Sequence, residues 1–220
     1  MAKTKAQLIT DIRQIIGQAD TSNSNFTDAQ LLIWLNDAYR RVVVATRNMP
    51  RSYRDYTAAA SVTLNSATIT VLNAKLKNPD SADQYYNLRI IGLDELLQMD
   101  PDYEAADTGL PEYLVRTDIG TAVLHPRPKS SVTALTTPLR LYATEMPTEL
   151  SSDSDTPSAL PPNLHDILIF YPSFRCFSSL NDEARATQQL TLFRGSLKDE
   201  RDAAIQFSPQ LNRWRFEDTL

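Results

Sequence analysis

The chain has 220 residues, of which 42% are hydrophobic and 22% are charged, and its 22 basic and 27 acidic residues give a net charge of −5. This composition is typical of a globular chain that forms one large domain or two small ones, and it excludes an intrinsically disordered chain. A net acidic chain is also not a general electrostatic binder of nucleic acid.

Targeting signals and disulfides are not expected. The N-terminal stretch MAKTKAQLITDIRQIIG lacks the apolar core of a signal peptide. No apolar run approaches the ~20 residues of a membrane span. We therefore expect the protein to stay in the cytoplasm in which it is made, without a membrane. The single cysteine, Cys176, excludes an internal disulfide, and its apolar surroundings predict a small buried hydrophobic residue.

Two helices are predicted in the N-terminal region. Residues 4–16 place apolar side chains at helical spacing, and Gly17 can end that helix. Residues 26–45, FTDAQLLIWLNDAYRRVVVA, predict the second helix. It begins with Thr27 and Gln30 at the spacing of a capping box, in which each side chain satisfies a free backbone N–H group.

The second helix is apolar on almost every side. An intramolecular core accounts for the side that carries Leu31, Leu35, Ala38, Val42 and Ala45. The opposite, polar side is marked by Asn36, Arg40, Arg41 and Arg47, yet Ile33 and Val44 fall there too. Two interpretations stay open for this pair: singly exposed apolar residues, which are common, or a contact surface for another subunit.

The middle of the chain predicts a small, mainly antiparallel β region. Strands are expected where Thr, Val, Tyr and Ile accumulate with partial alternation, near residues 53–58, 67–72, 86–91, 111–117, 121–126 and 139–147. A turn at residues 118–120 joins two of them into a hairpin. The stretch GLDELLQMDPDYEA predicts a short helix that breaks at Pro101.

Helical patterns return after the β region. Apolar side chains at helical spacing predict a helix over 163–179, which Pro172 should kink or restart, and a longer helix over 181–206. The expected fold class is α+β: an antiparallel helical bundle, built from the N-terminal two helices and the C-terminal two helices, with the mainly antiparallel β region inserted. The expected divisions are 1–50 (N-terminal helices), 51–150 (β region), 151–162 (linker), 163–207 (C-terminal helices) and 208–220 (extended arm).

The sequence predicts no catalytic or metal-binding constellation and no cofactor. His125 and His165 lack the partners of an HxH or HExxH motif, so both are expected to be satisfied surface or boundary residues. Asp153 and Asp155 lack the glycine and glutamate of a calcium loop and are expected to keep the linker solvated. Neither a GxSxG nucleophile elbow nor a GxxxxGK[ST] phosphate loop is present.

The C-terminal arm alternates arginine with aromatic residues in Arg213-Trp214-Arg215-Phe216. Such a pattern can stack on bases, anchor a protein interface or dock onto the chain's own bundle. Four residues and an acidic chain oppose a nucleic-acid claim. Docking onto the bundle and anchoring to a partner both stay open.

The layout resembles the head-to-tail adaptor (connector) proteins of tailed bacteriophages. The resemblance rests on the second helix, with Phe26, Thr27-Asp28, Leu31-Leu32 and Asn36-Asp37-Ala38-Tyr39. It also rests on a strand that ends in His-Pro-Arg-Pro, a Leu-x-Tyr strand, a Pro-x-x-Leu-Ser connection and a Leu-Pro-Pro helix start. The similarity covers nearly the whole chain in layout, although the β region is larger than in the smallest connectors.

This resemblance implies a structural protein of the virion, located in the neck between capsid and tail. Such adaptors form a homo-oligomeric ring, usually of twelve copies, under the portal protein, and they dock a tail or nozzle protein. Genomic DNA passes through the ring without sequence-specific binding. The C-terminal segment reaches toward the portal, which assigns portal binding to Leu211, Arg213, Trp214, Arg215 and Phe216. Ile33, Arg40 and Val44 become candidates for the subunit interface.

Two other functions remain as alternatives. The chain could be another virion or ligand-binding module whose β region recognises a ligand. Less in keeping with the sequence, it could be a small hydrolase that uses Asp166 with His165, or Asp153 with Asp155. A hydrolase would require one of these pairs to converge with other groups in a pocket.

Overall fold

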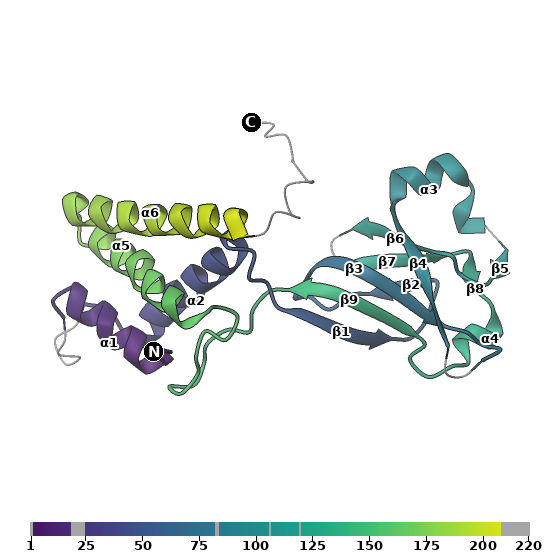
Figure 1. Ribbon diagram of the computed structural model, residues 1–220, viewed down its shortest axis with the longest axis horizontal. Coiled ribbons are helices and arrows are strands. Elements are labelled where there is room, and N and C mark those ends of the chain that lie inside the picture. Colours follow the sequence, from purple (N-terminus) through teal and green to yellow (C-terminus); the bar gives the residue numbers. More distant parts are fainter. Residues whose placement is uncertain (1, 19–24, 82–83, 106, 119, 208–220) are drawn as a thin grey trace. The chain divides into compact units, whose positions relative to one another are not determined.

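The computed structural model of the chain describes residues 2–18, 25–81, 84–105, 107–118 and 120–207. The chain divides into two compact units (Figure 1). The helical unit consists of Met1–Met49 and Pro147–Leu220, and the β unit consists of Pro50–Met146.

The helical unit contains α1 (Lys5–Ile15), α2 (Asp28–Ala45), the 3-10 helix η3 (Pro162–Ile169), α5 (Phe170–Ser179) and α6 (Glu183–Phe207). The capping box predicted at Thr27 and Gln30 is confirmed, and Thr4 and Gln7 form a second one at the start of α1. Gly17 has a φ of 70°, a left-handed conformation that glycine adopts without steric cost, and it lies just beyond the end of α1 as predicted.

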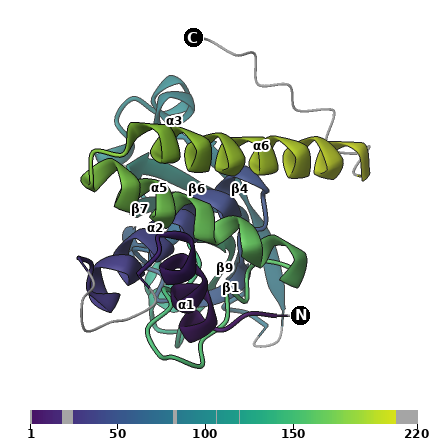
Figure 2. The same cartoon turned by 90° about the vertical axis from the view of Figure 1, so that its left-hand side faces the viewer.

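The C-terminal helices begin in an irregular way because of their prolines. The chain runs as a 3-10 helix from Pro162 and changes to the α-helix α5 at Phe170, so that Pro172 lies in the first turn of α5. A proline is tolerated there because the N–H groups of the first turn have no partner within the helix. The predicted restart near Pro172 is therefore confirmed. Figure 2 shows α5 and α6 side by side, and the two helices are in contact.

The core of the helical unit gathers side chains from all of its helices. Its fully buried members include Leu8 of α1, Leu31 and Leu35 of α2 and Leu168 of η3. Each such leucine contributes roughly 2 kcal/mol through the removal of its surface from water. Phe26 is buried in the same core, and its ring contacts Trp34 edge-on at 5.7 Å between centroids.

The β unit has nine strands and three short helices in its described part: β1 (Arg51–Tyr56), β2 (Ser61–Thr63), β3 (Thr68–Lys77), β4 (Tyr85–Gly92), α3 (Leu93–Met99), η2 (Tyr103–Ala105), β5 (Thr108–Gly109), β6 (Tyr113–Asp118), β7 (Thr121–His125), β8 (Arg127–Pro128), α4 (Ser130–Thr133) and β9 (Leu139–Glu145). Seven strands form one sheet in the order β1-β9-β3-β4-β6-β7-β2. β4 and β6 are parallel, whereas the other pairs of this sheet are antiparallel. β5 and β8 form a separate parallel pair.

The predicted fold class was wrong. Instead of a helical bundle with a small, mainly antiparallel insertion, the β unit is built on a large, curled seven-stranded mixed sheet, and two of the six α-helices of the described chain belong to it. The prediction failed because local alternation identifies strands but not their partners. α3 lies in the crossover between β4 and β6, which brings these strands together in parallel.

The two faces of this sheet have different surroundings. One face packs in a core that contains Leu76, Leu114 and Leu141, together with Val132 of α4. On the other face, α3 and η2 cover β4, β6 and β7 through a smaller cluster that contains Ile91, Leu96 and Val115. Neighbouring residues such as Leu114 and Val115 point to opposite faces, which distinguishes the two clusters.

Candidate functional site

The outward side of α2 carries the first candidate site. Ile33 is 64% exposed and Val44 is 45% exposed, although the buried side of the same helix fills the core of the helical unit. Asp37 and Arg40 lie between them at i+4 and i+7 from Ile33, so these four side chains share one side of the helix. We call this set the α2 stripe. The structure therefore brings the three predicted interface residues, Ile33, Arg40 and Val44, onto one surface of the helical unit.

The charged groups of the α2 stripe are paired within the helical unit. The Arg40 Nη1 atom lies 3.0 Å from Glu149 Oε1, and the Arg41 Nε atom lies 3.1 Å from Asp37 Oδ2. The Arg41 guanidinium also lies 4.9 Å from the centroid of the Tyr171 ring. These pairs neutralise the middle of the stripe. Its two apolar ends remain as the surface that a partner can bury.

Asn36 fixes α2 to the segment that follows the β unit. The prediction that Asn36 lies on the polar side was wrong, because the residue is only 6% exposed. Its Nδ2 atom donates to the Leu150 carbonyl at 3.1 Å, and its Oδ1 atom accepts from the Leu150 N–H at 2.9 Å. One side chain thus satisfies both main-chain groups of Leu150, the leucine of the Pro-x-x-Leu-Ser connection.

Tyr39 makes the next attachment, one turn further along α2. Its hydroxyl accepts a hydrogen bond of 2.8 Å from the Ala159 N–H, while the ring is buried in the core. Burial raises the pKa of the Tyr39 hydroxyl above its ordinary value. The Asn-x-Ala-Tyr step of α2 is therefore a clamp on residues 147–162. The motif is visible in the sequence, but the sequence does not predict that its partners are main-chain groups of Leu150 and Ala159.

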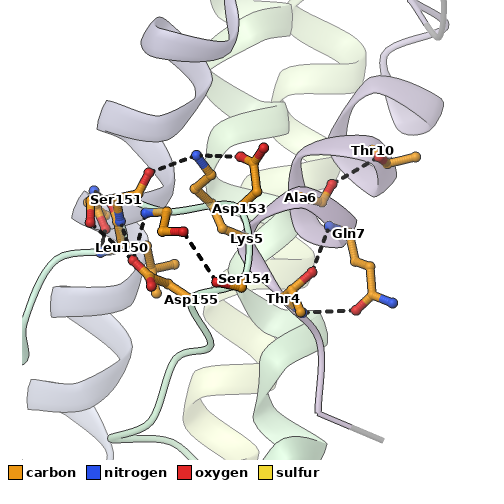
Figure 3. A network of polar contacts seen from close by, with 12 residues as sticks. Thr4, Lys5, Ala6, Gln7, Thr10, Leu150, Ser151, Asp153, Ser154 and Asp155 are labelled. Atoms are coloured by element: carbon orange, nitrogen blue, oxygen red, sulfur yellow. Dashed lines mark hydrogen bonds and ion pairs between the residues drawn. The ribbon is translucent and has the colours of Figure 1, made fainter.

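Residues 151–155, predicted as part of a linker, are fastened to the start of α1 (Figure 3). Lys5 Nζ lies 2.8 Å from Asp153 Oδ1 and donates to the Ser151 carbonyl at 2.9 Å. Asp155 Oδ2 accepts from the N–H groups of Ser151 and Ser152, both at 2.7 Å. These hydrogen bonds lower the pKa of the Asp155 carboxyl group.

The main chain of the same segment completes the start of α1. The Lys5 N–H donates to the Asp155 carbonyl at 2.7 Å, and the Ala6 N–H donates to the Asp153 carbonyl at 3.3 Å. The first N–H groups of a helix have no acceptor inside it, so these two carbonyls replace water there. Together with Asn36 and Tyr39, these contacts hold residues 147–162 against α1 and α2.

The two histidines and the cysteine have structural surroundings. His165 is satisfied as predicted but lies in the interior rather than at the surface, with 2% exposure. Its Nδ1 accepts from the Lys3 N–H at 3.1 Å, and its Nε2 lies 3.2 Å from the Leu160 carbonyl. His125 ends β7 as predicted. Cys176 is fully buried as predicted, and burial raises the pKa of its thiol to about 12, far from the reactive range.

The groups that a hydrolase would need do not converge. The Asp166 carboxylate is largely exposed and lies 2.6 Å from Lys3 Nζ, whereas the His165 ring is buried and faces main-chain atoms. Asp153 and Asp155 contact different partners, as described above. In the described part of the chain, no group of three or more His, Cys, Asp or Glu side chains could hold a metal ion.

One pocket of about 290 Å³ lies in the helical unit, between α1, the start of α2 and Asp153. Both cations in its lining are in ion pairs, Lys5 with Asp153 and Arg13 with Asp28. Its other lining residues include Ile9 and no histidine or cysteine. The two carboxylates of the lining, Asp28 and Asp153, are the partners in those ion pairs.

Two further features of the chain bear on its location and partners. The portal-binding residues predicted in the C-terminal arm, Leu211, Arg213, Trp214, Arg215 and Phe216, lie outside the described residues. Among the helices that the structure describes, none is long and apolar enough to cross a membrane. The α2 stripe is therefore the part of the predicted site that the structure describes.

In a comparison with protein-family models, residues 3–214 match the family described as SU10 adaptor protein. The match begins at the segment that leads into α1 and extends through both units into the C-terminal arm. A search of curated proteins found no match to the chain.

Proposed function

The chain belongs to the SU10 adaptor protein family, a family of phage head-to-tail adaptors, and we propose that it forms a ring beneath the portal of the filled head. It is a structural component of a phage particle. In the proposed assembly, about twelve copies surround a channel in the neck, extend the path of the DNA and present a surface to a tail or nozzle protein. The copies assemble on the portal in the host cytoplasm.

The α2 stripe supports a lateral contact between copies in this ring. Each subunit of a closed ring needs two complementary surfaces besides its own core. Ile33, at 64% exposure on a helix whose other side is buried, is the observation that supports this role best. Val44 lies on the same side, and Arg40 can exchange its pairing with Glu149 for an acidic group of a neighbour. We propose these three residues as part of the subunit interface.

The clamp on residues 147–162 supports a rigid ring subunit. An isolated helix end and an irregular segment would lose conformational entropy when a ring forms, and that loss would weaken association. Asn36 and Tyr39 order the segment before any partner binds, because their contacts are intramolecular. Residues 147–162, which include the Glu149 partner of Arg40, are therefore ordered in the single chain.

The proposed channel lets DNA pass without holding it. A net charge of −5 repels the phosphate backbone at long range and opposes tight, sequence-independent binding. The C-terminal arm binds the portal in this proposal, with Trp214 and Phe216 as aromatic anchors and Leu211, Arg213 and Arg215 around them. Aromatic and arginine side chains are the residue types that dominate protein interfaces.

Sedimentation of the chain with portal rings from the same phage tests this function. The components are run separately and together, with the full chain, a chain that lacks residues 211–220, and a Trp214→Ala/Phe216→Ala variant. A Glu217→Ala/Asp218→Ala variant changes the same arm without removing an aromatic ring and serves as the matched control. We expect a stoichiometric shift for the full chain and the control.

Each result bears on a different part of the proposal. Loss of the shift for the deletion and for the aromatic variant would support the arm as the portal anchor. A shift that survives both changes would keep the adaptor and exclude the arm as its anchor. The absence of association at any ratio for the full chain would contradict the adaptor proposal and favour a ligand-binding module.

A further inference from the structure

On one sheet face of the β unit, α3 packs over β4 and β6. Further along the same face, the side chains of Arg51, Tyr53 and Asp55 on β1 are exposed, so we call this part of the face uncovered. The residues of this uncovered part are set by the register. Tyr53 lies opposite Tyr142, and Asp55 lies opposite Arg140, which lies opposite Lys75. We call this surface the tyrosine–lysine face.

The tyrosine–lysine face combines aromatic rings with positive charge. Tyr53 is 62% exposed and stacks on Tyr142 with ring centroids 4.6 Å apart. The Arg140 guanidinium lies 5.0 Å from the centroid of the Tyr85 ring and forms a two-bond ion pair with Asp55, at 2.7 and 3.0 Å. Three tyrosines of this face, Tyr53, Tyr85 and Tyr142, thus contact neighbours, in orientations that a partner can meet without reordering them.

Its remaining charges are positive. Lys77 lies opposite Tyr85, Lys75 lies opposite Asn87, and Arg51 lies on the same face of β1 as Tyr53. Among the described residues, the side chains of Arg51, Lys75 and Lys77 form no ion pair. The face therefore presents three cations that have no ion-pair partner among the described residues.

The complementary chemistry is present in the same unit. Residues 93–107 contain six acidic residues and no basic residue. Asp94 and Asp102 are exposed, and the apolar side chains of Leu97 and Met99 between them are 40% and 49% exposed. The segment therefore offers carboxylates together with two exposed apolar side chains. Lysines around exposed tyrosines are its counterpart, because methionine and leucine pack well on aromatic rings.

We propose that the tyrosine–lysine face of one copy binds the acidic segment 93–107 of a neighbouring copy. Such a contact is head-to-tail, joining two different surfaces of one chain, which is the kind of interface that closes a ring. It adds a contact between β units to the contact through the α2 stripe. The inference rests on the proposed ring, since the occupant of the face is a second copy of the chain.

A second copy fits this face better than nucleic acid does. Among the described strand residues of this face, Asp55 is the one acid, and it forms an ion pair with Arg140 and would repel phosphate groups. The six acidic residues of segment 93–107 belong to the same small unit and would oppose the approach of DNA as well. In a ring of identical copies, each tyrosine–lysine face has one acidic segment of a neighbouring copy available. That segment would place the exposed Leu97 and Met99 against the tyrosines.

Paired charge reversals test the proposal in the full chain. Lys75→Glu/Lys77→Glu makes both surfaces acidic. Reversal of four exposed acids, Asp94→Lys/Asp102→Lys/Glu104→Lys/Asp107→Lys, changes the net charge of residues 93–107 from −6 to +2 and makes both surfaces basic. Each variant alone should associate at least about tenfold more weakly than the native chain near 0.1 M salt, because every contact then joins like charges. An equimolar mixture should recover native assembly, since the two variants can alternate around a ring and every contact again joins opposite charges. Sedimentation velocity, alone and on portal rings, measures the assembly.

The mixture separates this proposal from misfolding and from failure of the ring itself. Variants that could not fold would not recover on mixing. An Arg116→Glu/Lys129→Glu variant, altered in the same unit away from the face, should assemble like the native chain. If the native chain assembles and both reversals assemble equally well, this inference is overturned and the ring stands. A native chain that never self-associates overturns both, and duplex DNA bound by the native chain and lost in Lys75→Glu/Lys77→Glu would assign the face to nucleic acid instead.

Discussion

The helical unit and the β unit keep their irregular segments in place by different means. In the helical unit, single side chains fasten distant parts of the chain. Asn36 holds Leu150 across 114 residues, and Tyr39 holds Ala159 across 120 residues. No regular backbone ladder supports residues 147–162 along the way. The loss of one clamp residue therefore leaves buried main-chain groups without a partner.

In the β unit, hydrogen bonds between paired strands hold most of the chain in place. β9 pairs with β1 on one side and with β3 on the other, so each of its residues has several neighbours in register. Side chains such as Arg140 and Asp55 add cross-strand pairs to contacts that the ladder already makes. The comparison shows that a polar side chain stabilises the fold most where it is the hydrogen-bond partner of buried backbone groups. It stabilises the fold least where paired strands already satisfy those groups.

The largest expected effect follows from Asn36→Leu. The substitution keeps the volume but removes both hydrogen bonds to Leu150, whose backbone groups then stay buried and unpaired at about 1–3 kcal/mol each. We expect the helical unit to lose about 3 kcal/mol of unfolding free energy. Amide hydrogen exchange should accelerate over residues 148–160 before it changes elsewhere. Denaturant unfolding, followed by exchange in each unit, measures the effect.

Asn87→Leu provides the matched control in the β unit. Asn87 is exposed on β4, and leucine in a paired strand disturbs no backbone hydrogen bond. The unfolding free energy of the β unit should change by less than about 0.5 kcal/mol. Equal losses for the two substitutions would contradict the comparison between clamp and ladder.

Two tyrosine hydroxyls sharpen the comparison with one chemical change. The Tyr39 hydroxyl accepts from the Ala159 N–H at 2.8 Å, and the Tyr56 hydroxyl accepts from the Asn65 N–H at 3.3 Å, only nine residues away. Tyr39→Phe should destabilise the helical unit by about 1–2 kcal/mol, because the Ala159 N–H loses its acceptor. Tyr56→Phe should cost less than about 0.5 kcal/mol. A larger loss for Tyr56→Phe than for Tyr39→Phe would reverse the comparison.

Local patterns predicted the elements better than their partners. Apolar spacing and the capping box at Thr27 located α2, and alternation located most strands of the large sheet. The short strand β2 and the short helix α4 were not predicted, because three or four residues are too few to show a periodic pattern. The parallel pairing of β4 with β6 was not predicted either, since the residue pattern of a strand does not show which strand it pairs with.

The site shows the same limit at single residues. The exposure of Ile33 and Val44 follows from their helical angle, so the sequence alone could select them. Asn36 was misplaced by the same reasoning, because a helical wheel assigns any polar residue beside arginines to solvent. Its partner is the main chain of Leu150, and backbone groups have no sequence signature. For the same reason, the sequence identified Tyr39 as part of a motif but did not predict its hydrogen bond with the Ala159 N–H.

Acid should weaken the two units through different carboxylates. The pKa of Asp155 is lowered by the N–H groups of Ser151 and Ser152, and the pKa of Glu145 is lowered first by its hydrogen bond to Arg54. A lowered pKa means that the carboxylate stabilises the folded unit above its ordinary pKa near 4 and loses this contribution as the pH falls through the lowered value. Asp155→Asn should therefore flatten the acid dependence of the helical unit alone, and Glu145→Gln that of the β unit alone. Amide exchange between pH 7 and pH 3 would contradict this if either substitution altered the acid dependence of the other unit.

The smallest expected effect on folding, and the largest on assembly, belongs to Ile33→Asp. Ile33 is 64% exposed, so an aspartate there meets water in the single chain and should change the unfolding free energy by less than about 0.5 kcal/mol. In the proposed ring the same charge would be buried against a neighbour, where an unpaired carboxylate is costly, and association should be lost. Leu192→Asp is the matched control, since Leu192 is 43% exposed on α6 and outside the α2 stripe. If light scattering showed that Ile33→Asp and Leu192→Asp assemble alike, the α2 stripe would not be part of the interface. The hydrogen bonds from Asn36 and Tyr39 to residues 147–162 would then serve the stability of the helical unit alone.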